Sequence, residues 1–98
     1  MKLFTKEILK KLPPLYSQEK VEDPIAQVKL FNPCGAGTWY LSEYDPEEKI
    51  AFGLCVIHEA ELGNVYIPEL EQYRGPLGLG IERDLHWSPR PLSQCEGS

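Results

Sequence analysis

The sequence lacks the features that place a chain in a membrane or export it from the cell. Its longest apolar run, residues 50–57, has the length of a strand, whereas about 20 apolar residues are needed to cross a bilayer. The N-terminal segment MKLFTKEILKKLPP carries lysines throughout, and it has neither the apolar core nor the small-residue cleavage site of a secretory signal. We therefore expect a cytoplasmic protein that has no membrane partner.

Paired cysteines are also missing. The chain has three cysteines, Cys34, Cys55 and Cys95, and no C-x-x-C pair, which excludes a zinc knuckle and a thioredoxin-like redox motif. Cys55 lies inside an apolar run and is expected to be a small core residue. We expect reduced thiols, and we assign no metal ligand and no cofactor.

The sequence also lacks the composition of a basic surface. The formal net charge is −5, from 15 acidic and 10 basic side chains, whereas nucleic-acid binders present a basic patch that neutralises phosphates. One cluster of lysines spreads over a predicted short helix beside Glu7, and its members are Lys2, Lys6, Lys10 and Lys11. We interpret this cluster as the solvated face of the helix, so direct binding to nucleic acid is not expected.

Local signals and periodicity indicate a small mixed domain. Thr5 is a good helix N-cap and Pro13-Pro14 ends a helix, so residues 5–12 are predicted to be helical, as are residues 68–73. Alternating apolar residues between turn signals predict strands at residues 25–31, 38–44, 50–58, 65–67 and 80–87, with a turn at Gly63-Asn64. Residues 50–58 are apolar on both faces, which is typical of a central strand.

The predicted fold class is α+β. We expect a single domain over residues 1–98, with a mainly antiparallel, meander-like sheet of about four to five strands and two short helices. The tail from Ser88 is rich in proline and then polar. It is expected to be loosely held, with order ending at about residue 92.

Residues 59–85 concentrate glycine, proline and charge, and they contain the best candidates for a site. The segment RGPLGLG follows a predicted helix and precedes a predicted strand. A Rossmann fingerprint is G-x-G-x-x-G between a strand and a helix, and a P-loop needs Gly-Lys-Ser/Thr. We therefore interpret these glycines as turn residues and not as a phosphate-binding loop.

Glu82, Asp84 and His86 alternate along the predicted last strand. Alternation places them on one face, with neighbours about 6–7 Å apart, so they suit a divalent metal or an acid, a base and an orienting group. Candidates to join them are His58, Glu59 and Glu61. Alternatively, this face is the solvated side of the sheet, and Arg83 on the opposite face pairs with a carboxylate elsewhere. No serine or cysteine has the local context of a nucleophile, and we assign no catalytic residue.

Aromatic residues are numerous for so short a chain, with two tryptophans and five tyrosines. Trp39 and Tyr40 are adjacent on a predicted strand, so they point to opposite faces and leave one of them available for exposure. An exposed aromatic flanked by Glu43 and Tyr44 suits a protein–protein interface. Trp39 is therefore a candidate binding residue.

Several motifs occur in a recognisable order: LFTKEILKKLPPLYSQE, then TWY followed by FGL, then EAELG, and finally RGPLGLGIERDL. Together they resemble an uncharacterised bacterial family, domain of unknown function 2958, over residues 1 to about 92. The resemblance implies a small cytosolic protein encoded on plasmids, integrative elements or other mobile DNA, and it implies no activity. The residues that match the family pattern are Glu59, Glu61, Gly63, Arg74, Gly75, Glu82, Arg83 and Asp84. Cys34 and Cys95 lie in segments peculiar to this chain.

These features predict a non-enzymatic accessory or interaction domain that binds a protein partner, or itself as a homodimer, through an acidic and aromatic sheet surface. The alternative is a small metal-binding or hydrolytic domain that uses Glu82, Asp84 and His86. We also predict a hydrogen-bonded ion-pair network that stabilises the fold, formed by Glu59, Glu61, Arg74, Glu82, Arg83 and Asp84. The candidate binding residues are this set together with His86 and Trp39.

Overall fold

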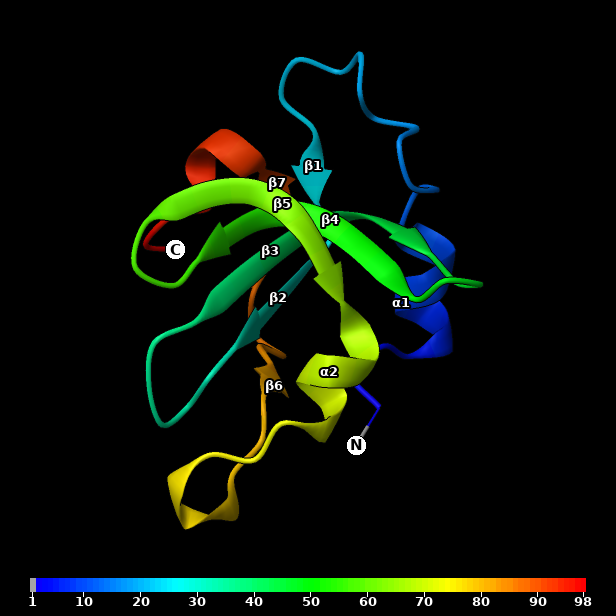
Figure 1. Ribbon diagram of the computed structural model, residues 1–98. Coiled ribbons are helices and arrows are strands. Elements are labelled where there is room, and N and C mark those ends of the chain that lie inside the picture. Colours follow the sequence, from blue (N-terminus) through cyan, green and yellow to red (C-terminus); the bar gives the residue numbers. More distant parts are fainter. Residues whose placement is uncertain (1) are drawn as a thin grey trace.

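A five-stranded antiparallel sheet organises residues 2–98, the part of the chain that the computed structural model describes (Figure 1). In order across the sheet, its strands are β5 (Ala60–Tyr66), β4 (Ile50–Val56), β3 (Thr38–Asp45), β2 (Val28–Phe31) and β6 (Glu82–Arg83). A two-stranded sheet pairs β1 (Ile25–Ala26) with β7 (Arg90–Pro91).

The helical segments are α1 (Lys6–Lys11), α2 (Ile67–Gln72) and the 3-10 turns η1 (Pro76–Gly78) and η2 (Leu92–Gln94). The predicted α+β class is confirmed. None of the helices in residues 2–98 is long and apolar enough to cross a membrane.

Local signals set the first helix, as predicted. The hydroxyl of Thr5 accepts the backbone N–H of Ile8 at 3.2 Å, which satisfies one of the free donors at the helix N-terminus. At the other end, the N–H of Leu12 donates to the carbonyl of Ile8 at 3.1 Å. Pro13-Pro14 then stops the helix, because proline supplies no N–H. Buried Leu12 and half-buried Ile8 pack into the main core.

The central strand is β3 and not β4. β3 lies between β2 and β4, and its residues 39–43 are all buried. The prediction that residues 50–58 form the central strand is therefore wrong, although β4 is paired on both sides. Ser42 and Glu43 explain the error. Polar residues in a strand predict that the strand is partly exposed, whereas both of these residues are buried.

Pairing partners override local composition in two other strands. Gly63-Asn64, predicted to be a turn, lies within β5, opposite Gly53 and Phe52 of β4. The chain turns instead at residues 57–59. The predicted strand at residues 25–31 is divided at Gln27, whose N–H donates to the carbonyl of Leu41 at 2.8 Å. Its first half, β1, pairs with the C-terminal strand β7.

The predicted strand at residues 80–87 is reduced to β6. Glu82 lies opposite Phe31, and Arg83 lies opposite Leu30. Asp84 ends the strand, because its Oδ1 accepts the backbone N–H of His86 at 3.0 Å and closes a turn. The prediction that His86 shares a strand face with Glu82 and Asp84 is therefore wrong.

Both faces of the sheet carry an apolar cluster. Trp39 belongs to the larger one, together with residues of α1 and α2, and Tyr40 belongs to the smaller one with Leu92 and Cys95. The two aromatics point to opposite faces, as predicted. However, Trp39 is 8% exposed and Tyr40 is 3% exposed, so the expectation of an exposed aromatic at this pair is wrong. Leu92 and Cys95 of the C-terminal segment cover part of the second face, and local sequence does not predict this contact.

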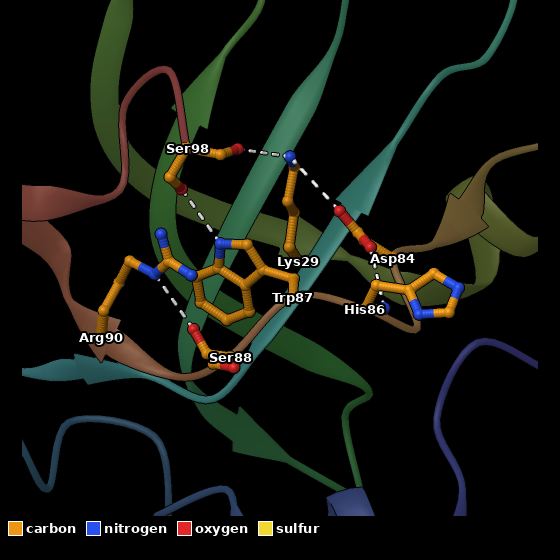
Figure 2. Close-up of polar contacts among 7 residues, drawn as sticks. All are labelled: Lys29, Asp84, His86, Trp87, Ser88, Arg90 and Ser98. Carbon is orange, nitrogen blue, oxygen red and sulfur yellow. Dashed lines mark hydrogen bonds and ion pairs between the residues drawn. The ribbon is translucent and has the colours of Figure 1, made fainter.

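The C-terminal segment makes specific contacts where the sequence predicts a loosely held tail. The carbonyl of Ser98 accepts the ammonium group of Lys29 at 2.6 Å, and its hydroxyl accepts the indole N–H of Trp87 at 3.0 Å (Figure 2). The guanidinium of Arg90 lies 5.0 Å from the centre of the Trp87 ring, a cation–π distance. These contacts place residues 88–98 against the sheet and leave part of its second face open.

Candidate binding groove

A groove of about 570 Å³ lies on the same face of the sheet as Tyr40. Its floor includes Phe52 of β4 and its cross-strand partner Asn64 of β5, with Leu62 two residues earlier on the same face. Residues 16–24, in the loop between α1 and β1, form one wall. Leu92 of η2 also lines the groove, so its boundary depends on the placement of the C-terminal segment.

Glu43 of β3 fixes the loop that forms this wall. The register of β3 against β4 shifts between Leu41 and Glu43, and the Glu43 side chain is only 3% exposed. Its Oε1 accepts the backbone N–H of Tyr16, and its Oε2 accepts that of Gln18, both at 2.8 Å. A buried carboxylate is tolerated when such donors replace its lost hydration. The position of the wall is therefore set by a side chain of the central strand.

The groove has apolar surface that nothing in residues 2–98 covers. Leu62 is 61% exposed, Val21 and Tyr16 are also exposed, and Phe52 is half-buried. Single exposed apolar residues are ordinary on protein surfaces. Here they border one hollow, which is the arrangement expected of a binding surface.

β5 borders the groove with a free edge. It pairs with β4 on one side and, in the described part of the chain, with no strand on the other. An edge strand presents unpaired backbone N–H and C=O groups, which proteins commonly protect with lysine, proline or a bulge. The sequence of β5, AELGNVY, has one charged residue, Glu61, and contains neither lysine nor proline. The edge is therefore open to an added strand.

The charged side chains that line the groove are all carboxylates. Glu43 is engaged by two backbone N–H groups, whereas Glu19 and Glu22 are exposed and take part in no ion pair within residues 2–98. The neighbouring Asp23 is engaged, because its carboxylate accepts the N–H and the hydroxyl of Ser93. The groove thus combines an apolar floor with two available negative charges.

The predicted ion-pair network does not form, because its arginines bind backbone carbonyls. Arg74 donates to the carbonyl oxygen of Tyr73 at 2.6 Å and to that of Glu71 at 3.1 Å. Arg83 donates to the carbonyl oxygen of Leu3 at 2.6 Å. Neither guanidinium is paired with a carboxylate among residues 2–98, so the prediction is wrong. Arg83 instead ties β6 to the segment that precedes α1.

The acidic members of the predicted network lie apart. Glu59 and Glu61 are exposed beside the turn between β4 and β5. Asp84 forms the one ion pair found in residues 2–98, with Lys29 at 3.5 Å, and also accepts the N–H of His86 (Figure 2). Across the same described residues, no group of three His, Cys, Asp or Glu side chains is placed to hold a metal ion. A binding role for the predicted residues stays a prediction.

Sequence reasoning named one groove residue, Glu43, only as a neighbour of the candidate interface aromatic, and it missed the others as site residues. One signal was available, since Glu43 is a charged residue within the aromatic strand TWYLSEYD, and a buried charge needs partners. Its partners are backbone N–H groups of residues 16 and 18, 25 or more positions away in the chain. Side-chain patterns cannot reveal them.

Comparison of the chain with curated proteins found no match, and comparison with solved structures found none either. One family model, described as a protein of unknown function (DUF2958), matches residues 3–95 of the 98-residue chain. The matched range includes the loop that forms the wall, the strands of the floor and the edge strand β5. It also contains the motifs TWY and RGPLGLGIERDL, so the resemblance seen in the sequence is confirmed. The protein belongs to the DUF2958 family.

Proposed function

We propose that this domain is a non-enzymatic interaction domain that binds a protein partner through the groove and the adjoining edge of β5. The observation that carries the proposal is the apolar floor, where Leu62 is 61% exposed on β5, a strand whose outer edge pairs with no other strand in residues 2–98. Exposed apolar surface rimmed by polar residues marks the sites at which proteins bind partners. The setting implied by the family resemblance, an accessory protein of bacterial mobile DNA, is part of this proposal.

The side chains that line the groove support binding more than catalysis. They include no histidine, cysteine or serine that could act as a nucleophile or a base. The one deeply buried carboxylate, that of Glu43, already accepts two backbone N–H groups. What the lining offers instead is apolar area and hydrogen-bonding edges, the components of a recognition surface.

Two surface variants test the proposal in a bacterial lysate that contains the partner. Leu62→Asp places a charge on the floor of the groove, whereas Leu77→Asp places the same charge on η1, where Leu77 is 89% exposed and outside the groove. Both sites are solvent-exposed, so we expect both variants to fold, which urea denaturation checks. A protein captured by the wild type and by Leu77→Asp, but lost with Leu62→Asp, is the expected result.

Two results would overturn the proposal. One is a set of captured proteins that is the same for the wild type and both variants, because the groove would then contribute nothing. The other is a dimer in sedimentation velocity that Leu62→Asp dissociates and Leu77→Asp does not. In that case the groove is occupied by a second copy of this chain and not by a different protein.

A further inference from the structure

We infer that the partner supplies an extended segment with lysine or arginine between apolar residues, and that this segment adds to the sheet as a strand beside β5. The inference rests on the proposed function and names the class of partner for the same groove. It follows from the backbone of β5, from the apolar floor and from the charges of the lining.

The backbone of β5 is suited to strand addition. The strand is seven residues long and is paired on one side only within the described residues. Main-chain hydrogen bonds to such an edge supply affinity, while alternate side chains of the added segment supply specificity. The single charge in β5, on Glu61, attracts a basic segment and does not block pairing with one.

The groove selects the side chains of the added segment. Successive residues of an extended chain point to opposite faces, so every second side chain faces the side on which Leu62 and Phe52 lie. A long basic side chain can pack its apolar stem on Leu62 and extend its cation towards Glu19 and Glu22. No lysine, arginine or histidine lines the groove. Lys20, the one basic residue of the loop over residues 15–24, is not among the lining residues.

The same charges disfavour an acidic segment and a second copy of the chain. Each copy carries a formal net charge of −5. Pairing β5 with β5 of another copy would join two chains of the same negative net charge, each with a glutamate in the paired strand, and such like charges repel. A basic segment is instead attracted by the same carboxylates.

Titration of the 15N-labelled protein with short peptides tests the inference. The test peptide is Lys-Val-Lys-Val-Lys-Val-Lys with both ends blocked. Matched peptides carry glutamate in place of each lysine, or N-methyl groups on the amides of both edges, so that neither edge can pair in either orientation. We expect the lysine peptide to shift the amide signals of residues 60–66. The N-methylated peptide should bind at least tenfold more weakly, because it cannot complete the hydrogen-bond ladder, and the glutamate peptide should not bind.

Charge variants of the protein complete the test. Glu19→Gln with Glu22→Gln should weaken binding of the lysine peptide several-fold. The matched pair Glu47→Gln with Glu48→Gln, in the exposed turn between β3 and β4, should leave it unchanged.

If the N-methylated peptide binds as tightly as the lysine peptide, strand addition is overturned. If the glutamate peptide binds as tightly as the lysine peptide, the basic character of the partner is overturned. If the lysine peptide fails while capture still depends on Leu62, the inference fails and the proposed function stands.

Discussion

At the scale of single residues, Glu43 connects the central strand to the loop that forms one wall of the groove. Tyr16 in that loop has a φ of 69°, which is uncommon for a residue other than glycine and costs free energy. The conformation persists because Glu43 accepts the N–H groups of both Tyr16 and Gln18. One buried carboxylate therefore holds a strained turn in place and shapes the hollow beneath it.

Replacing Glu43 by glutamine should destabilise the protein. The amide group of glutamine presents a donor to one of the two backbone N–H groups, so one charge-assisted hydrogen bond is lost and a buried donor is left unpaired. We expect the free energy of unfolding to fall by about 1–3 kcal/mol, measured by urea denaturation. Glu48→Gln is the matched control, because Glu48 is exposed, and it should change stability by less than about 0.5 kcal/mol. Equal urea midpoints for the two variants would contradict this role of Glu43.

At the scale of the elements, the close approach of β3 and β4 depends on Gly53. A Cβ atom at this position would overlap the carbonyl oxygen of Tyr40 and lie 2.8 Å from the Cα atom of Leu41. Gly53→Ala should therefore force the two strands apart and cost about 3 kcal/mol or more.

The cross-strand partner of Gly53 gives a matched control. Gly63 of β5 lies directly opposite, and a Cβ atom there would meet nothing within 4 Å. Gly63→Ala should keep stability within about 0.5 kcal/mol of the wild type. Thermal unfolding of the two variants compares them directly, and similar losses at both positions would show that β3 and β4 do not require the glycine.

The accuracy of the prediction for each element depends on how far apart in the sequence its interacting residues lie. α1 was predicted because Thr5 and Pro13-Pro14 act within one turn of its ends. β5 was predicted only from residue 65 onwards because Gly63-Asn64 has the composition of a turn, while seven cross-strand pairs with β4 extend the strand back to Ala60. β6 was predicted to be too long because the alternation of residues 80–87 outweighed the tendency of Asp84 to close a turn. Local signals thus located the elements, and pairing set their limits.

At the scale of the whole molecule, the candidate site could not be read from the sequence. The groove is lined by residues between 16 and 92 that the sheet and two covering segments bring together. The prediction of a charged network assumed that arginines pair with carboxylates. Arg74 and Arg83 instead donate to the backbone carbonyl oxygens of Tyr73 and Leu3. Ion pairs between exposed side chains contribute little free energy, so the fold did not require the predicted network.

The whole molecule should also lose stability at alkaline pH. Burial raises the pKa of the Cys55 thiol, with a further contribution from Glu61. Burial is likewise the main cause that raises the pKa of Cys95, and it also raises the pKa of Tyr44. Each group therefore holds its proton more tightly in the folded state. Between the ordinary and the raised pKa, the unfolded chain has released a proton that the native state retains, so stability falls as pH rises.

The ordinary pKa values place the start of this loss at about pH 8.5 for the thiols and about pH 10 for the tyrosine. Urea midpoints measured under reducing conditions at pH 7.5, 9.5 and 10.5, values chosen to bracket these pKa values, should therefore fall in that order.

Tyr44→Phe keeps the edge-to-face contact with Phe4, whose ring centre lies 4.8 Å away, and removes the phenol. This variant should match the wild type up to pH 9.5 and then lose less stability, whereas Tyr66→Phe, at an exposed position, should follow the wild type throughout. If stability were constant or rising over this range, the native state could not be the form that retains these protons, because a raised pKa fixes the sign of the pH dependence.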